Sequence, residues 1–207
     1  MMARQTTVFI VDDDNAVRGS LRLLLKSAGL PAVAHASAKE FLDNWHPEQP
    51  GCLILDVRMP GMSGIELQSE LNRRGAIIPV IFISGHGDIP MAVEAIQHGA
   101  FDFLPKPFSD KDLIDRVQRA LATDAENRKA LVGKDALRNR YDSLTPREQE
   151  VLALVTQGKA NKVMAGDLGV SQRTVEIHRA RVMEKMGANS LAHLVRMTID
   201  LEINREG

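Results

Sequence analysis

The first 121 residues alternate short apolar runs with longer amphipathic stretches, and this alternation constrains the fold more than any other sequence feature. Runs that are apolar throughout are typical of strands covered by helices on both faces of a sheet. The stretches between them, such as 15–28 and 63–73, have the length and spacing of helices. The pattern predicts an α/β doubly wound, five-stranded parallel sheet. The five expected strands are Val8–Val11, Pro31–His35, Cys52–Leu55, Val80–Ile83 and Phe101–Leu104.

Glycines mark the ends of three expected helices in this first part. Gly29, Gly75 and Gly99 each follow an amphipathic stretch, where a left-handed C-terminal cap is wanted. Residues 109–140 are polar with apolar residues at helical spacing, which predicts a last helix that runs on as a helical linker. Gly133 is a candidate position for an interruption of that helix.

The remainder, from Leu144 to about Ile203, has helical spacing and no strand pattern, and it predicts an all-α unit of four helices. The segment Thr145-Pro146-Arg147-Glu148 combines an N-cap, a proline at the first helical position and a capping-box glutamate. The middle two helices and the turn at Gly169 form a helix-turn-helix, whose second helix is expected to enter the major groove of DNA. The later three helices are expected at Asn161–Leu168, from Ser171 to about Met186, and after Ser190.

Composition excludes several other classes of protein. The chain has 207 residues, of which 44% are hydrophobic and 26% charged, as in a folded globular protein. No apolar run reaches the roughly 18 residues that a membrane helix needs, so we expect a cytoplasmic protein without a membrane partner. Cys52, the only cysteine, lies in an apolar run and is expected in the core. The last 66 residues balance 9 basic against 9 acidic side chains, so DNA affinity there requires a local basic stripe.

Polar residues follow four of the five expected strands. Asp12 and Asp13 come after the first strand, Asp56 after the third, Ser84 after the fourth and Lys106 after the fifth. Because ligands bind at the carboxyl ends of strands in open α/β sheets, the topology brings these five groups to one rim. The sequence therefore predicts a reactive site at that rim.

The expected chemistry of this rim is transfer of a phosphoryl group to an aspartate. Crowded carboxylates repel one another unless a hard divalent cation joins them, and Mg²⁺ prefers such oxygen ligands. One carboxylate then attacks the phosphoryl group, while the metal and Lys106 neutralise charge and the Ser84 hydroxyl donates to a phosphoryl oxygen.

Polar residues that follow strands also have ordinary structural explanations. Asp14 or Asn15 after a strand is usually a helix cap. Asp56 alone is more often a turn residue, and Lys106 is more often a solvated loop lysine. The coincidence of the groups at the strand ends favours the reactive site. The Lys106-Pro107 bond is a candidate cis peptide.

Four segments of this first part resemble two-component receiver domains, particularly those of the FixJ and StyR type. They are Val11-Asp12-Asp13-Asp14, Leu55-Asp56-Val57-Arg58-Met59-Pro60-Gly61-Met62-Ser63-Gly64, Ile83-Ser84-Gly85-His86-Gly87-Asp88 and Phe103-Leu104-Pro105-Lys106-Pro107-Phe108. The resemblance implies a flavodoxin-like receiver fold and phosphorylation by a partner histidine kinase. It implies Asp56 as the phospho-acceptor, with Mg²⁺ held by Asp12, Asp13, Asp56 and the backbone carbonyl of Arg58.

The same resemblance implies a conformational relay. Ser84 and Lys106 are its polar members, and Phe103 lies where the family has a switch aromatic. Such an aromatic turns inward as the Ser84 loop closes on the phosphoryl group. The alternative is that Phe103 is simply a core residue, and we favour the switch.

The helix that begins after Ser171 has apolar residues along one face and polar or basic residues on the others, as expected for a helix that packs inward and faces DNA outward. The candidates for phosphate contacts are Lys162, Arg173, Arg181 and Lys185. The candidates for reading base edges are Thr174, Glu176, Ile177, His178 and Arg179. For a basic helix face taken alone, a solvated surface is the more common explanation.

This region resembles the LuxR-type DNA-binding domain. The resemblance rests on Leu144-Thr145-Pro146-Arg147-Glu148, Gly158, Asn161-Lys162, Ala165, Leu168-Gly169-Val170-Ser171, Thr174-Val175-Glu176-Ile177-His178-Arg179 and Lys185-Met186. It implies a dimer on paired half-sites of double-stranded promoter DNA and control of transcription, most often activation. The expected domains are a receiver at 6–122, a helical linker at 123–141 and the LuxR-type domain at 142–207.

These observations lead to one hypothesis and two alternatives. Phosphorylation of Asp56 is expected to promote a homodimer and promoter binding, with RNA polymerase as a further partner, and the chain is not expected to be a turnover enzyme. One alternative is a phosphohydrolase of the haloacid-dehalogenase type, because Asp12 and Asp14 satisfy its Asp-x-Asp pattern. The other is a DNA-binding regulator that does not depend on phosphorylation. Repression in place of activation also stays open.

Overall fold

The computed structural model describes residues 5–85 and 89–201, and the chain divides into two compact units, residues 1–129 and 130–207. The boundary lies inside one long helix, so the first seven residues of the expected linker at 123–141 belong to the first unit. His86, Gly87 and Asp88, which form part of one receiver-like segment, lie outside the described residues.

The first unit is built on a five-stranded parallel sheet, as predicted, with the strand order β2-β1-β3-β4-β5. Each expected strand is present within two residues of its expected bounds. The strands are β1 (Thr7–Val11), β2 (Ala32–His35), β3 (Gly51–Asp56), β4 (Val80–Ser84) and β5 (Asp102–Pro105).

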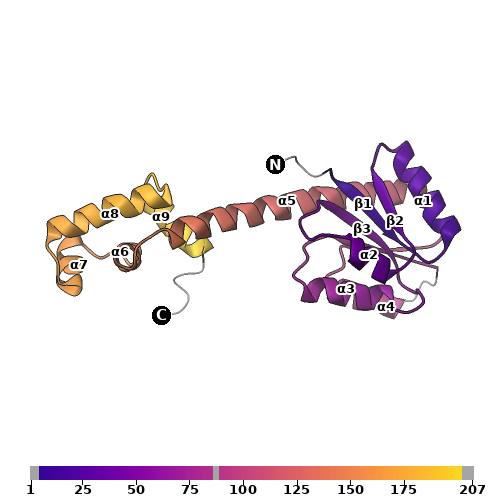
Figure 1. Ribbon diagram of the computed structural model, residues 1–207, viewed down its shortest axis with the longest axis horizontal. Coiled ribbons are helices and arrows are strands. Elements are labelled where there is room, and N and C mark those ends of the chain that lie inside the picture. The colour runs from indigo at the N-terminus through magenta and orange to yellow at the C-terminus, as the bar shows by residue number, and fades with distance from the viewer. Residues whose placement is uncertain (1–4, 86–88, 202–207) are drawn as a thin grey trace. The chain divides into compact units, whose positions relative to one another are not determined.

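Helices cover both faces of the sheet, which is why its central strands, β1, β3 and β4, are buried along their whole length (Figure 1). Successive β1 side chains point to opposite faces: Phe9 packs on one side and Ile10 on the other. The Phe9 face is covered by α2 (Ala38–Asn44), α3 (Gly64–Arg73) and α4 (Ile89–Gln97). The Ile10 face is covered by α1 (Asn15–Ser27) and α5 (Asp110–Asp142).

Local signals at the helix ends behave as the sequence predicts. The Asp14 side chain caps α1 by accepting from the backbone amides of Ala16 and Val17. Gly29, Gly75 and Gly99 all have positive φ, a conformation that glycine adopts without steric cost. The Lys106–Pro107 peptide bond is cis.

Helix α5 is continuous from Asp110 to Asp142, so the candidate interruption at Gly133 is absent. Nothing lies within 4 Å of the position where a Cβ would extend from Gly133, and its neighbours on both sides are exposed. A glycine in a helix interior costs about 1 kcal/mol relative to alanine, which the long helix tolerates here.

The second unit contains four helices after α5 in its described part, as expected. They are α6 (Pro146–Thr156), α7 (Asn161–Leu168), α8 (Gln172–Met186) and α9 (Leu191–Asp200). Thr145 and Glu148 form the predicted capping box of α6. A compact core joins all four helices through residues such as Val151, Met164 and Val175. The last helix ends at Asp200, a few residues before the expected Ile203, which lies outside the described residues.

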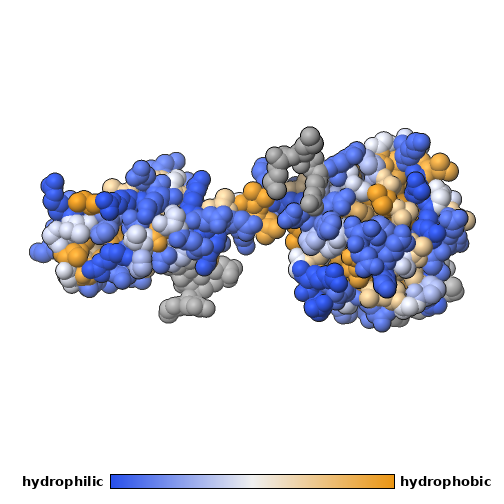
Figure 2. Space-filling model, viewed as in Figure 1, coloured by the Kyte–Doolittle hydropathy of each residue, from blue (hydrophilic) through white to orange (hydrophobic). Residues whose placement is uncertain are grey.

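The visible surface of each unit is largely hydrophilic, with scattered exposed apolar residues (Figure 2). Scattered apolar residues are normal on a folded protein. Within residues 5–85 and 89–201, every helix is too short or too polar to cross a membrane.

The contact between α3 and the end of β3 gives the first prediction. A Cβ at Gly64 would lie 2.2 Å from the backbone oxygen of Asp56, whereas a Cβ at Gly19 in α1 would meet nothing within 4 Å. We expect Gly64→Ala to destabilise the receiver by about 3 kcal/mol through overpacking. The control Gly19→Ala is expected to stabilise it by about 1 kcal/mol through helix propensity. Urea unfolding followed by the fluorescence of Trp45 measures both, and equal effects would contradict the close approach.

Candidate functional site

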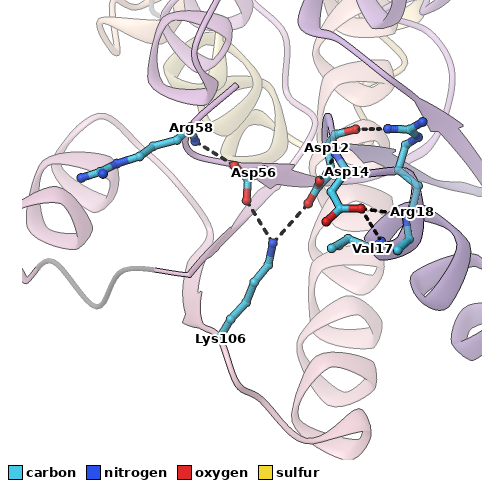
Figure 3. A network of polar contacts seen from close by, with 8 residues as sticks. Asp12, Asp14, Val17, Arg18, Asp56, Arg58 and Lys106 are labelled. Carbon is cyan, nitrogen blue, oxygen red and sulfur yellow. Dashed lines mark hydrogen bonds and ion pairs between the residues drawn. The ribbon is translucent and has the colours of Figure 1, made fainter. Parts of the chain in front are cut away.

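Two buried carboxylates and one lysine meet at the carboxyl edge of the sheet (Figure 3). Asp12 follows β1, Asp56 ends the neighbouring strand β3, and Lys106 follows β5. The Nζ atom of Lys106 lies 3.2 Å from Oδ2 of Asp12 and 3.1 Å from Oδ1 of Asp56. One ammonium group therefore joins the two carboxylates.

Backbone groups hold the other oxygen of each carboxylate. The amide of Asp14 donates to Oδ1 of Asp12 at 2.8 Å, and the amide of Arg58 donates to Oδ2 of Asp56 at 2.8 Å. The carboxylates are thereby oriented toward Lys106 before any ligand binds. Asp12 is 1% exposed and Asp56 is 9% exposed.

Arg18 also supports this loop, although nothing in the sequence singled it out. Its guanidinium in α1 donates to the backbone oxygen of Asp12 at 2.7 Å (Figure 3). It also donates to the side chain of Asn15 at 3.2 Å. An arginine one turn into a helix is an ordinary surface residue in sequence terms, so only the folded loop shows this contact.

The electrostatics of the cluster reflect burial and crowding. Burial raises the pKa of Asp12, the Asp14 amide and Lys106 oppose that rise, and the neighbouring charge of Asp56 adds to it. For Lys106, burial alone would lower the pKa, but the hydrogen bond to Asp56 and the charge of Asp12 outweigh it and leave the pKa raised. Lys106 is therefore a stable cation facing a carboxylate whose charge is costly.

Ser84 and Phe103 lie on β4 and β5, the two strands that adjoin the backbone of Lys106. Ser84 ends β4 and is buried, and its backbone oxygen accepts from the Lys106 amide at 2.7 Å. Phe103 on β5 is half-buried, with its ring centroid 6.5 Å from that of Phe82. The strand register pairs Phe82 with Phe103, so this aromatic contact lies two residues from Ser84.

Asp13 and Arg58 are exposed at the same edge, next to Asp12 and Asp56 respectively. Within residues 5–85 and 89–201, no three His, Cys, Asp or Glu side chains are grouped closely enough to hold a metal ion. The described cluster consists of two carboxylates already joined by Lys106.

The helix-turn-helix of the second unit consists of α7, a left-handed Gly169 and α8. Several side chains chosen from the sequence as DNA contacts are exposed on it. These are Lys162 on α7 and Arg173, Glu176, Ile177, Arg181 and Lys185 on α8. Thr174 is half-buried, with its Oγ1 2.8 Å from the hydroxyl of Ser171.

Three of the candidate DNA-contacting side chains are hydrogen-bonded or partly buried within the second unit. The guanidinium of Arg179 is hydrogen-bonded to the side chain of Asn161 on α7. The Nδ1 atom of His178 is buried and has no hydrogen-bond partner among the described residues. Lys185 donates to Oε2 of the buried Glu148 at 2.6 Å and to the backbone oxygen of Ser143 at 3.2 Å.

The Lys185–Glu148 pair joins α8 to the start of α6. Its hydrogen bond, together with the Thr145 amide, lowers the pKa of Glu148. Sequence reasoning identified Glu148 only as a capping residue. A capping box does not reveal that the same carboxylate also binds a lysine 37 residues away.

Comparison with known proteins agrees with both units. The response regulator receiver domain family matches residues 8–118, and the LuxR family of bacterial regulatory proteins matches residues 142–198. The transcriptional regulatory protein FixJ of Azorhizobium caulinodans is 49% identical over 96% of this chain and 94% of its own length. The response regulator protein TodT of Pseudomonas putida is 45% identical over 100% of this chain and 91% of its own length.

Solved structures lead to the same conclusion. The response regulator StyR is 49% identical, with a TM-score of 0.85, over 94% of this chain and 98% of the StyR chain. Full-length FixJ from B. japonicum is 38% identical, with a TM-score of 0.58, over 97% of this chain and 99% of its own. The chain therefore belongs to the two-component response regulators of the FixJ and StyR type, in which a receiver domain is joined to a LuxR-type DNA-binding domain.

Proposed function

We propose that a partner histidine kinase phosphorylates Asp56 and that this modification controls dimerisation and promoter binding by the LuxR-type domain, with activation of transcription as the output. The observation that carries the proposal is the Lys106 ammonium, which lies within 3.2 Å of both Asp12 and Asp56. Family membership supports a kinase and DNA as partners.

In the proposed reaction, one carboxylate oxygen of Asp56 attacks phosphorus, and the bond between phosphorus and the donor imidazole nitrogen breaks. The electron pair of that bond goes to the imidazole, and the product is an acyl phosphate on Asp56. Lys106 stands where negative charge accumulates on the phosphoryl oxygens. Its raised pKa keeps it protonated throughout the physiological range.

The residues present fit a Mg²⁺ ion by their chemistry. Hard carboxylate oxygens suit Mg²⁺. The pKa of Asp12 is raised chiefly because its carboxyl group is buried, so a divalent cation would stabilise the charged form of this side chain. Asp12, Asp13 and Asp56 would hold the ion together with the Arg58 carbonyl, after Asp13 turns toward the pocket. When bound, the ion neutralises phosphoryl charge.

Ser84 and Phe103 are the proposed relay from this pocket to the rest of the receiver. The backbone amide of Lys106 donates to the backbone oxygen of Ser84 and so links the ends of β4 and β5. A phosphoryl group that binds the Lys106 ammonium therefore also affects the position of Ser84. Phe103, half-buried against Phe82, is placed to turn further inward as that loop moves. In this proposal the phosphorylated receiver forms a homodimer, and the dimer bound to the promoter contacts RNA polymerase.

DNA recognition is assigned to the exposed face of α8. Ile177 is 47% exposed on α8, so its side chain is accessible to a thymine methyl group in the major groove. Glu176 and Ile177 are therefore proposed for base edges, and Arg173 and Arg181 for phosphates. Thr174, His178 and Arg179 are proposed at the edge of that surface, and Lys162 and Lys185 as further phosphate contacts.

The phosphohydrolase alternative finds less support in the same geometry. The second aspartate of the Asp-x-Asp pattern, Asp14, is engaged as the N-cap of α1. The relatives described above are named as regulators, not as phosphatases.

Phosphoryl uptake gives the second prediction. With Mg²⁺ and acetyl phosphate, the wild-type chain is expected to gain one phosphoryl group in intact-protein mass spectrometry, and Asp56→Asn is expected to gain none because its side chain is no longer an anionic nucleophile. Asp43→Asn, an exposed aspartate on α2, is the matched control and is expected to behave as wild type. Removal of Mg²⁺ with EDTA is expected to prevent the uptake. Uptake by Asp56→Asn at the wild-type rate contradicts the assignment.

DNA recognition gives the third prediction, tested on a duplex that the phosphorylated wild type selects from a random pool. Arg173→Ala is expected to lower the slope of log K against log salt by about 2, because the dimer loses one phosphate contact in each half-site. Ile177→Ala is expected to leave that slope unchanged and to reduce discrimination at one base pair of each half-site by about 1 kcal/mol. The same change in both variants would contradict the division of roles.

A further inference from the structure

A buried carboxylate on α5 lies outside the phosphorylation site. Asp124 is 1% exposed, and its Oδ2 accepts from the backbone amide of Gly51 at 2.9 Å. Gly51 is the first residue of β3, and Asp56 is the last residue of the same strand. Asp124 therefore binds the opposite end of the strand that carries the proposed phospho-acceptor.

Arg128 completes this contact and extends it to the loop before β3. Its Nε donates to Oδ2 of Asp124 at 2.8 Å, and its two terminal nitrogens donate to the backbone oxygens of Pro47 at 2.9 Å and Gln49 at 2.8 Å. The guanidinium side chain is 19% exposed. We call Asp124 and Arg128, with these partners, the α5 clamp.

The clamp lies where α5 leaves the core of the receiver. After Arg128, eight consecutive residues of the helix, 129–136, are exposed. The next half-buried residue is Leu137, which packs in the core of the second unit. The receiver family match ends at residue 118, before the clamp begins.

Stability alone explains this arrangement poorly. Burying an ion pair costs desolvation, and replacing such a pair by apolar residues is often neutral or stabilising. Oδ1 of Asp124 is buried without a hydrogen-bond partner among the described residues, which adds to the cost. What the pair supplies is directional geometry: a planar guanidinium with three fixed donors sets the helix position against the loop and the strand.

We propose that Asp124 and Arg128 are positioning residues that hold α5 rigidly on the receiver, so that the change produced by phosphorylation is carried along the helix to the DNA-binding domain. This inference rests on the function proposed above. With the clamp open, Asp56 is still phosphorylated, but the effect of phosphorylation on DNA binding is lost. The reason is that the exposed segment of α5 after Arg128 no longer moves together with the receiver.

The test compares two paired substitutions in the full chain. Asp124→Asn with Arg128→Met opens the clamp, leaves no buried charge and keeps an acceptor for the Gly51 amide. Arg138→Met with Asp142→Asn is the matched control, because it removes an exposed ion pair with the same spacing from the same helix. Each protein is treated with Mg²⁺ and acetyl phosphate, and binding is measured on the duplex selected by the wild type.

Three measurements decide the outcome. Amide hydrogen exchange in residues 119–129 is expected to quicken in the clamp variant only. Phosphoryl uptake by mass spectrometry is expected to stay within twofold of wild type in both variants. The gain in DNA affinity on phosphorylation is expected to fall at least fivefold in the clamp variant and to be unchanged in the control.

Unchanged hydrogen exchange, or faster exchange with a full gain in affinity, overturns the clamp while leaving the proposed function intact. If the wild type itself shows no gain in affinity, the proposed function fails and the inference falls with it. Should the paired clamp variant unfold, Arg128→Lys serves instead, since it keeps the charge but loses the planar fork. The increase in DNA affinity on phosphorylation is then expected to be partly lost. If Arg128→Lys shows the same increase as the wild type, the proposed role of the clamp is overturned.

Discussion

The ammonium of Lys106 between two buried carboxylates is the interaction on which the carboxyl edge of the receiver sheet depends. Asp12 follows β1 and Asp56 ends the neighbouring strand β3, and the two buried carboxylates would repel each other without a cation between them. Lys106 reaches them from beyond β5, and its amide is bound to the end of β4. The cation therefore joins the ends of four strands, β1, β3, β4 and β5, through one side chain and its own backbone.

Strand β3 has a paired carboxylate at each end. Asp56 at the carboxyl end is neutralised by Lys106, and Asp124 at the amino end is neutralised by Arg128. The strand between them is entirely buried between β1 and β4 and leaves little room for sliding. Strand β3 therefore connects the proposed phosphorylation site at one end to α5, the helix that continues into the second unit, at the other.

The DNA-binding unit shows how neighbouring helices alter what one helix suggests. Helical periodicity separates the buried Val175 from the exposed Ile177 correctly. It does not reveal that Arg179 is bound by Asn161 on α7, or that Lys185 is bound by Glu148 on α6. Those partners lie 18 and 37 residues away, and only the packing of three helices brings them together.

The positions of the strands, of most helix ends and of the polar residues at the sheet edge could be predicted from the sequence alone, because each depends on a pattern within a few neighbouring residues. Apolar runs predicted all five strands, and glycines and capping residues predicted helix ends. The positions of Asp12, Asp56 and Lys106 after the carboxyl ends of parallel strands predicted that they share one edge. The interruption of α5 expected at Gly133 was wrong. The low helix propensity of one glycine is a weak effect, and α5 packs in the receiver core before Gly133 and in the core of the second unit after it. The contacts of Arg18, Glu148 and the α5 clamp were decided only by the tertiary structure, since a hydrogen bond between distant residues depends on how whole elements pack.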